Sequence, residues 1–195
     1  SLTKVFSSGD IQQQLSSATA ELNSIERQFK LWTSNAHDIL KCFKLCANHK
    51  AVEMFEEWIR KIENIQKALE EFLQKKRTAF PRFYFLSNEN LLKIFAEARN
   101  PKAVQPFLPK LFDGIHTLEF SLSGQDIISM SSVEGEKVML THCQSIGAIE
   151  AWMKNLERCM KLSLHRVLKE GKSEFFSLSR KDWLQKYQAQ VITVY

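Results

Sequence analysis

An apolar side chain recurs every three or four residues through the first part of this chain. The stripe consists of Ile11, Leu15, Ala18, Leu22, Ile25, Phe29 and Trp32. Alternating steps of four and three residues place all of them on one face of a helix. Asp10 is the predicted N-cap, with Gln13 completing a capping box. We predict that this stripe packs against another long helix of the same chain, with a coiled coil to a separate partner as the alternative.

A second amphipathic stretch follows a short connection. Its apolar positions are Val52, Phe55, Ile59, Ile62, Leu69, Phe72 and Leu73, and the opposite face is charged. Two long amphipathic helices with a short connection form an antiparallel pair. We predict breaks at Ser34-Asn35 and at Asn48-His49, and an end of the second helix at Pro81.

Aromatic and apolar residues are dense directly after Pro81. We predict a short buried extended segment at 82–86, and then a helix capped by Ser87. The buried side of that helix would be Leu91, Leu92, Ile94 and Phe95. The prolines at 101, 106 and 109 then permit only short helical turns.

The periodicity changes to two near residue 117. Apolar and polar residues alternate from Thr117 to Leu122, and two further short runs lie at 127–130 and 137–140. Turn signals at 123–125 and 134–135 separate the runs, which predicts a small antiparallel meander at about 116–142. A long helix from Ile149 to Leu168 with a stop at Gly171, and a last helix opened by Ser179 and Asp182, complete the pattern.

Together these elements predict a mainly α fold, with elongated helical bundle subdomains and a small antiparallel β meander. The predicted subdomains are 1–80 and 81–195. The formal net charge is +5, but Lys and Arg are spread along the sequence, so nucleic-acid binding is not expected. No apolar run approaches the roughly 20 residues that span a bilayer, and the polar start predicts no signal peptide.

The sequence offers no recognisable catalytic or metal site. Cys42, Cys46, Cys143 and Cys159 form no CxxC pair, and we interpret them as reduced, mostly buried thiols of an intracellular protein. The glycines are isolated, so no phosphate-binding loop is predicted. His142 and Cys143 are neighbours in a predicted strand and would point to opposite faces. The paired carboxylates Glu56-Glu57 and Glu70-Glu71 belong to solvated helix faces. We therefore expect no catalytic, cofactor-binding or metal-binding residues.

One stretch is far more specific than these patterns. Residues 75–92 read KKRTAFPRFYFLSNENLL, followed by Asn100-Pro101, Val104-Gln105-Pro106, Leu111–Ile115 and Ser131–Val138. Their order and spacing closely resemble the linker of dynein heavy chains over roughly residues 50 to 170. Residues 1–49 match that family only as amphipathic helix. Phe107 stands where a polar residue or His is expected.

The resemblance implies a mostly helical arm that lies across a ring of AAA+ modules in the same polypeptide. Such an arm bends and straightens as the ring hydrolyses ATP. This chain would be the C-terminal half of the linker, and it looks more axonemal than cytoplasmic. It implies no cofactor in this segment, with ATP and Mg bound by the ring. Implied partners are the ring modules and, through the parent chain, other dynein subunits and microtubules, in the axoneme of a cilium or flagellum.

That role predicts hinge and contact residues. The candidate hinge residues are Ser34, Asn35, Asn48 and His49, because hinges lie at element ends; the Pro81-Arg82 break is expected to be rigid. Candidate ring contacts are Arg82, Asn88, Glu89, Asn90, Glu134, Glu136 and Lys137, although turn and cap roles explain several of them equally well. The alternative function is a stand-alone helical scaffold or adaptor whose 11–32 stripe binds a partner helix.

Overall fold

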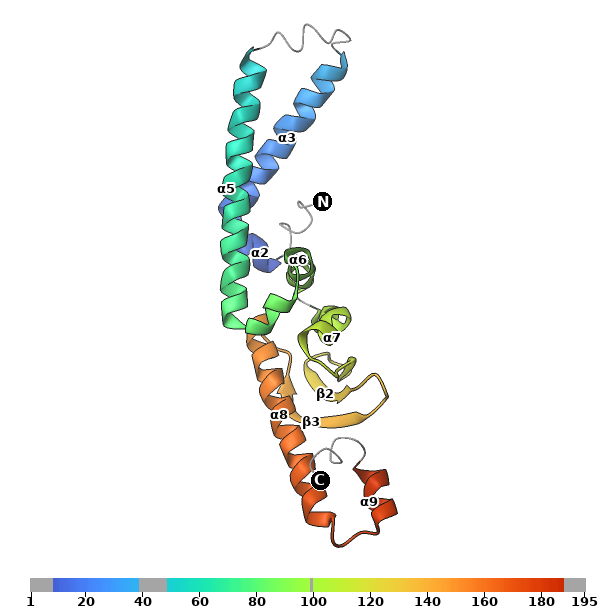
Figure 1. Ribbon diagram of the computed structural model, residues 1–195. Helices are drawn as coiled ribbons and strands as arrows, with labels where there is room; N and C mark the ends of the chain where they lie inside the picture. Colours follow the sequence, from blue (N-terminus) through green and yellow to red (C-terminus); the bar gives the residue numbers. More distant parts are fainter. Residues whose placement is uncertain (1–8, 39–48, 99, 188–195) are drawn as a thin grey trace. The chain divides into compact units, whose positions relative to one another are not determined.

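The computed structural model describes residues 9–38, 49–98 and 100–187, which divide between two compact units (Figure 1). The first unit contains the chain up to Thr78 together with Leu91–Ala96, and the second contains Ala79–Asn90 and the chain from Glu97 onward. Helices and a small antiparallel sheet make up the described chain, which confirms the predicted mainly α class. The subdomain boundary at residue 80 stays a prediction.

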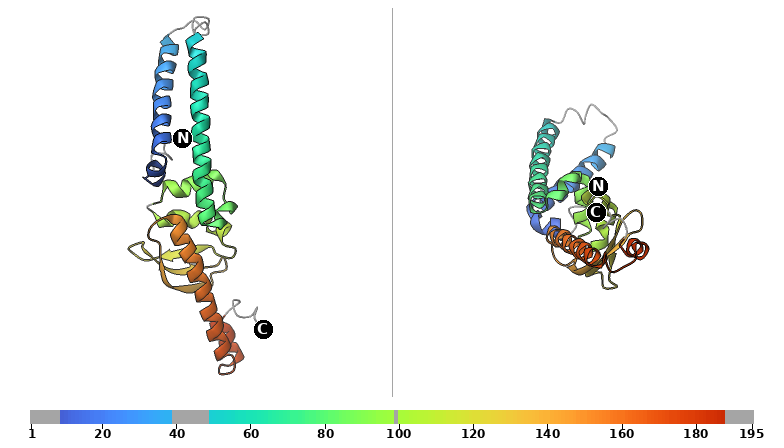
Figure 2. Two further views of the ribbon diagram at one scale, coloured as in Figure 1. Left: turned by 90° about the vertical axis from the view of Figure 1, so that its left-hand side faces the viewer. Right: turned by 60° about the horizontal axis from the view of Figure 1, so that its bottom comes forward.

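Two long antiparallel helices dominate the first unit, as predicted (Figures 1 and 2). They are α3 (Ser16–Asp38) and α5 (His49–Ala79), the latter ending two residues before Pro81. A short helix, α2 (Gly9–Gln14), precedes α3. The single helix predicted from Asp10 is therefore wrong in two details. Helix α2 begins at Gly9, so Asp10 lies inside it, and the helix divides at Leu15.

Helix α3 continues through Ser34 and Asn35, so the break predicted there is wrong. The hydroxyl of the preceding Thr33 donates to the carbonyl of Phe29 at 2.8 Å, within the same helix. Polar residues near a helix end can satisfy themselves on the preceding turn without ending it. The hinge predicted at this point thus has no interruption of the helix behind it and stays a prediction. Asn48 lies outside the described residues, and His49 is the first residue of α5.

The predicted extended segment after Pro81 is wrong, because residues Pro81–Phe85 form a 3-10 helix, η1. Proline fits the first turn of such a helix, and backbone hydrogen bonds from Phe83 to Phe80 and from Leu86 to Phe83 close it. Phe83 is buried, but Tyr84 and Phe85 are exposed. Helix α6 (Asn88–Ala96) follows, and the Asn90 amide donates to the Ser87 hydroxyl at 3.3 Å, which confirms the predicted cap.

Two short helical segments lead into the sheet of the second unit. They are η2 (Pro101–Phe107) and α7 (Leu108–Leu111). The strands β1 (Thr117–Phe120), β2 (Asp126–Ser131) and β3 (Lys137–Gln144) lie in the order β1-β2-β3 with antiparallel pairing, so the predicted meander is confirmed. Leu118 lies opposite Met130, and Ile127 opposite Cys143. Gly124 and Gly135 have positive φ at the two turns, where a side chain would be strained.

Helix α8 (Ile149–Glu174) packs against β3, and α9 (Arg180–Lys186) follows it. Trp152, Met153 and Leu156 are among its buried residues, as the apolar pattern predicts. The stop predicted at Gly171 is wrong, since α8 continues for three more residues and Gly171 is buried inside it. The cap of the last helix is confirmed, because the Asp182 amide donates to the Ser179 hydroxyl at 3.2 Å. None of the helices in the described parts is both long and apolar enough to cross a membrane.

Candidate functional site

Arg82, one of the predicted ring-contact residues, makes three contacts within the second unit. One guanidinium nitrogen donates to the Leu111 carbonyl at 2.9 Å, and another lies 3.5 Å from a carboxylate oxygen of Glu157. The guanidinium carbon also lies 4.9 Å from the centroid of the Phe112 ring, a cation–π arrangement. Arg82 thereby connects η1 to the end of α7 and to α8.

A groove of about 400 Å³ opens beside Arg82. Its apolar wall includes Phe112, Ile115, Met130, Val138, Met160 and Leu164. Arg82, Glu136, Glu157 and Lys161 supply charged groups around this wall. The structure thus brings Arg82 and Glu136 together, although 53 residues separate them in the sequence. A concave, mostly apolar surface with a few charged groups is typical of binding sites.

The other predicted contacts do not all gather at this groove. Glu134 is exposed in the β2–β3 turn, and Lys137 forms an ion pair with Glu119 across the sheet. The hydrogen bond from Lys137 is the main cause that lowers the pKa of Glu119. Asn88, Glu89 and Asn90 lie instead at the start of α6, in its first turn. The seven candidates therefore do not form one cluster: Arg82 and Glu136 line the groove, whereas the others lie apart from it.

Sequence reasoning missed Glu157, which serves two cations. Lys161 lies 2.8 Å from its carboxylate and Arg82 lies 3.5 Å from it. The hydrogen bond from Lys161, followed by the charge of Arg82, lowers the pKa of Glu157. The step of four residues from Glu157 to Lys161 is a readable helix signal. The pairing with Arg82 spans 75 residues and has no local signal.

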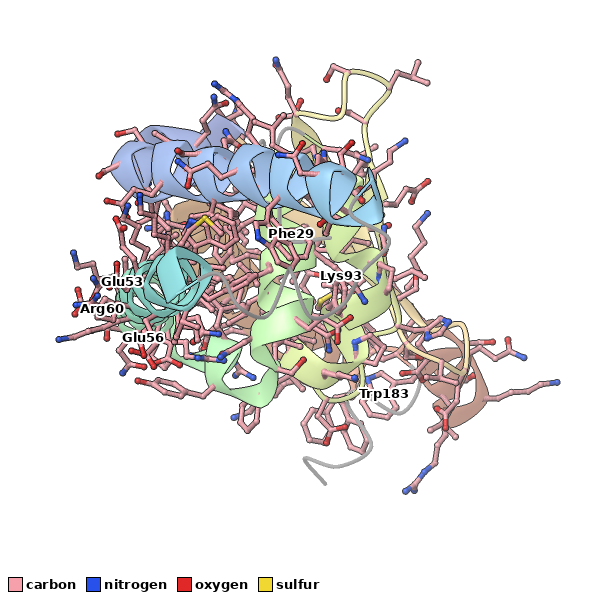
Figure 3. All side chains as sticks on the ribbon, turned by 90° about the horizontal axis from the view of Figure 1, so that it is seen from above. Phe29, Glu53, Glu56, Arg60, Lys93 and Trp183 are labelled. Carbon is pink, nitrogen blue, oxygen red and sulfur yellow. The ribbon has the colours of Figure 1, made fainter. Side chains whose placement is uncertain are left out.

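An aromatic seam joins α3 to α5 in the first unit. The Trp58 indole N–H donates to the Gln28 side-chain oxygen at 2.8 Å. Trp32 packs edge-to-face on Phe55 with centroids 4.8 Å apart, and Phe55 does so on Trp58 at 5.2 Å. Such pairs add about 0.5–1.5 kcal/mol each beyond the area that they bury. Glu53, Glu56 and Arg60 project outward from α5 (Figure 3).

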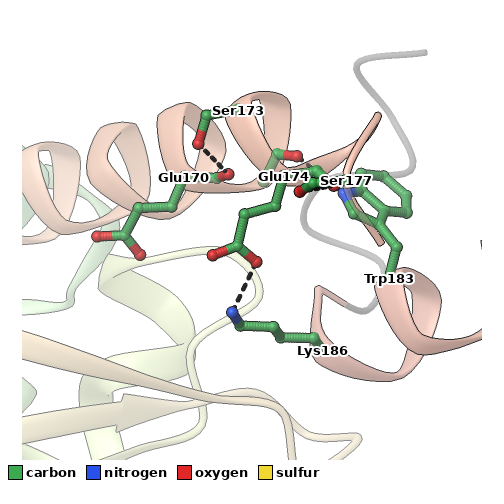
Figure 4. A network of polar contacts seen from close by, with 7 residues as sticks. Glu170, Ser173, Glu174, Ser177, Trp183 and Lys186 are labelled. Atoms are coloured by element: carbon green, nitrogen blue, oxygen red, sulfur yellow. Dashed lines mark hydrogen bonds and ion pairs between the residues drawn. The ribbon is translucent and has the colours of Figure 1, made fainter. Parts of the chain in front are cut away.

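A compact corner joins α8 to α9. Trp183 is buried, and its indole N–H donates to the Gly171 carbonyl at 2.8 Å. The Lys186 ammonium lies 2.6 Å from the Glu174 carboxylate (Figure 4). This hydrogen bond is the main cause that lowers the pKa of Glu174, and it raises the pKa of Lys186. Partly buried side chains complete the cluster around Trp183 and Tyr187: Val167, Leu168, Phe175 and Leu178.

These features hold elements together and offer few groups for chemistry. Cys143 and Cys159 are buried, as predicted, while Cys42 and Cys46 lie outside the described residues. Burial raises the pKa of Cys143 to about 12, so its thiol stays protonated. His142 is exposed beside it, which agrees with the predicted opposite faces. In the described part of the chain, no three His, Cys, Asp or Glu side chains gather as metal ligands would.

Comparison with known proteins decides the family. Residues 1–171 match the family described as dynein heavy chain, N-terminal region 2. The chain belongs to this family. It is 35% identical to the human dynein axonemal heavy chain 1 over 193 residues, which cover 97% of this chain. It is 34% identical to the human dynein axonemal heavy chain 6 over 202 residues, which cover 94% of this chain. It is also 32% identical to the dynein-1-beta heavy chain of the flagellar inner arm I1 complex of Chlamydomonas reinhardtii, over 95% of this chain.

This dynein heavy-chain sequence is short beside those relatives. It spans about 4% of the human dynein axonemal heavy chain 1 and about 5% of the human dynein axonemal heavy chain 6. The region that matches the family includes both units of the structure up to residue 171. Both of these relatives, and the flagellar protein, are dynein heavy chains by name. The chain is therefore part of a dynein motor protein, with axonemal heavy chains among its relatives.

The stretches that resemble dynein linkers contact one another in the structure. Phe80 packs on Phe112 with ring centroids 6.2 Å apart, and Arg82 bonds the Leu111 carbonyl. The Gln105 side chain bonds both the amide and the carbonyl of Leu118, so it fixes η2 against the start of the sheet. The distinctive residues of this dynein segment thus act as its internal supports.

Proposed function

We propose that this chain is part of the linker of an axonemal dynein heavy chain and acts as a non-catalytic lever arm. In this role it couples ATP-driven changes of an AAA+ ring in the same polypeptide to movement along microtubules. The axonemal relatives support a place in the cytoskeleton of a cilium or flagellum. The family match supports membership in the motor, and the geometry supports the mechanical role.

One observation carries this proposal: the residues that resemble the family make internal contacts that stiffen the second unit. Arg82 alone joins η1, the end of α7 and α8. Helix α8 has 26 residues and is therefore roughly 39 Å long. It is held along one side by the sheet and at its end by the Trp183 corner. A lever must not dissipate displacement, and close packing of this kind makes protein interiors resist deformation.

The partners and cofactors follow from the same proposal. ATP and Mg would be bound by the ring, and this segment would bind neither. Ring modules would dock at the groove beside Arg82 and Glu136, where a modest polar and apolar surface permits reversible contact. Asn88, Glu89 and Asn90 would form a second contact at the start of α6. Other dynein subunits and microtubules would be reached through the rest of the heavy chain.

Nucleotide binding tests the non-catalytic part of this proposal. The purified chain and a longer dynein heavy chain that extends into the ring are compared for ATP binding and ATP hydrolysis. We expect the longer protein to bind and hydrolyse ATP and this chain to do neither. ATP hydrolysis by this chain alone would refute the proposal, because a lever segment has no use for its own nucleotide site.

A second candidate function is a helical scaffold that binds a partner helix. It is favoured by exposed apolar residues on the long helices of the first unit, since Phe29, Val52 and Ile59 are each about half exposed, at 49%, 54% and 56%. Analytical ultracentrifugation of the purified chain distinguishes the two functions. Tight dimerisation that is lost in Val52→Gln plus Ile59→Gln would favour the scaffold. A monomer at micromolar concentration favours the lever.

A further inference from the structure

Six basic side chains form a straight row on α8. They are Lys154, Arg158, Lys161, His165, Lys169 and Lys172, and we refer to them as the basic ridge. Steps of four, three, four, four and three residues keep all six on one side of the helix. Every one of them is exposed, and the Lys161 side chain is 73% exposed.

The ridge lies opposite the side by which α8 is anchored. Trp152, Leu156, Cys159 and Ser163 are buried on the other face of the same helix. The ridge therefore points away from the core of the second unit. Its ends, Lys154 and Lys172, are 18 residues apart, which corresponds to roughly 27 Å along the helix. That length matches five turns of a second helix lying alongside.

Little of this positive charge is neutralised locally. Lys161 pairs with Glu157, and Arg158 donates to the neutral Asn155 amide oxygen. Two other acidic residues of α8 are engaged away from the ridge: Glu170 pairs with Arg166, and Glu174 with Lys186. Among the described residues, Lys154, Lys169 and Lys172 form no ion pair. Uncompensated charge of one sign over such a length attracts a partner of opposite sign.

We propose that the basic ridge binds an acidic protein segment outside this chain, one that presents Asp and Glu at helical spacing. The straight row with steps of three and four residues fits carboxylates on a facing helix. No aromatic side chain lies on the ridge, whereas proteins that bind single-stranded nucleic acids stack bases on aromatic rings. This inference uses the proposed function in one respect: it takes the segment to work inside a multi-subunit dynein. The acidic segment would add a lateral contact to the lever in addition to the groove.

Carbodiimide crosslinking of the intact dynein that contains this heavy chain tests the proposal. The reagent joins a lysine amine to a carboxylate only where the two form a close pair. The ridge variant replaces four lysines by glutamine: Lys154, Lys161, Lys169 and Lys172. The control variant replaces four exposed lysines off the ridge by glutamine: Lys50, Lys67, Lys102 and Lys110.

We expect mass spectrometry to find the ridge lysines joined to Asp or Glu of an acidic segment elsewhere in the complex. One exposed ion pair changes an equilibrium constant by roughly 1.4- to 5-fold. Loss of four such pairs should therefore weaken binding of that segment by about fourfold or more in the ridge variant and not in the control. Raising the salt concentration from about 0.1 M to about 1 M shortens the screening length from roughly 10 Å to roughly 3 Å, and should reduce the crosslinks similarly.

Three results would overturn the proposal. The ridge lysines could crosslink only to carboxylates of this chain, such as Glu157. Ultraviolet crosslinking could instead retain RNA on the wild type and not on the ridge variant. Vesicles containing phosphatidylserine could bind the wild type and not the ridge variant. The crosslinking measurement needs neither ATP turnover nor movement. If the ridge lysines do not crosslink to another segment, the lever proposal still stands. If the lever proposal is refuted, the crosslinking result can still be interpreted.

Discussion

Replacing Trp183 by alanine should loosen the corner between α8 and α9. The indole is buried, contacts Phe175 at a centroid distance of 5.2 Å, and donates to the Gly171 carbonyl at 2.8 Å. Truncation of a buried Trp costs about 3–5 kcal/mol. The carbonyl of Gly171 also loses its donor, and this loss of about 1 kcal/mol is part of that cost. Because the cluster around the indole is only partly buried, we expect a loss near the lower limit, about 3 kcal/mol.

Hydrogen exchange of the α9 amides measures this loss directly. Local opening exposes these amides, and a destabilisation of about 3 kcal/mol raises the opening constant by roughly 150-fold, up to the limit set by global unfolding. Leu184→Ala is the matched control, since Leu184 lies on the same helix but is 42% exposed. Its exchange should change little, because exposed substitutions usually stay within about 0.5 kcal/mol. Equal exchange in both variants would refute the view that Trp183 holds the corner.

Three further predictions follow from single contacts. In Lys186→Gln, the pKa of Glu174 should rise towards its ordinary value, as measured by NMR titration. Because the folded protein lowers this pKa, the Glu174–Lys186 pair stabilises the corner fully at a pH above the ordinary carboxyl pKa. The stabilisation is lost as the pH falls through the pKa of the folded protein. Arg82→Ala should lower the free energy of unfolding in urea by about 1–3 kcal/mol, because the carbonyl of the buried Leu111 loses its charged donor, and Arg82→Lys should recover only part of the loss. Gly135→Ala should cost about 1–2 kcal/mol in the same assay, since its φ of 88° is strained for any side chain, and an unchanged stability would contradict the turn assignment.

The sequence predicted best those elements whose signals are local. The two long helices of the first unit follow from their apolar periodicity, and the meander follows from alternation between glycine turns. The Ser87 and Ser179 caps were also predicted, because a cap needs only a hydroxyl a few residues before a free amide.

The wrong predictions arise where tertiary contacts override a local preference. Gly171 usually ends a helix, yet here it is buried and its carbonyl accepts the Trp183 indole, so α8 continues past it. Residues 82–86 carry aromatic side chains typical of strands, but the 3-10 turn buries Phe83 against Phe80 and places Arg82 beside Leu111. Ser34 and Asn35 looked like a break, although neither residue prevents a helix from continuing.

The candidate site was predictable only in part for the same reason. Turn chemistry and the family resemblance each point to Arg82 and Glu136 as separate candidate contacts. The groove that the two residues share forms only when the chain folds. The partnership of Arg82 with Glu157 spans 75 residues, which no local pattern can encode. The basic ridge, by contrast, is visible in the sequence as basic residues at steps of three and four. Only the fold shows that the opposite face of α8 is buried, so that the ridge faces away from the core.

The proposed lever role, in which this dynein segment transmits force without chemistry of its own, has one most direct test. Trp183→Ala is placed in the complete heavy chain, and ATP turnover and microtubule gliding velocity are measured together. The lever account predicts that turnover is retained while gliding slows, because a loosened corner dissipates the displacement, and that Leu184→Ala changes neither. Unchanged gliding by Trp183→Ala, in a motor whose α9 amides exchange faster, would contradict the account.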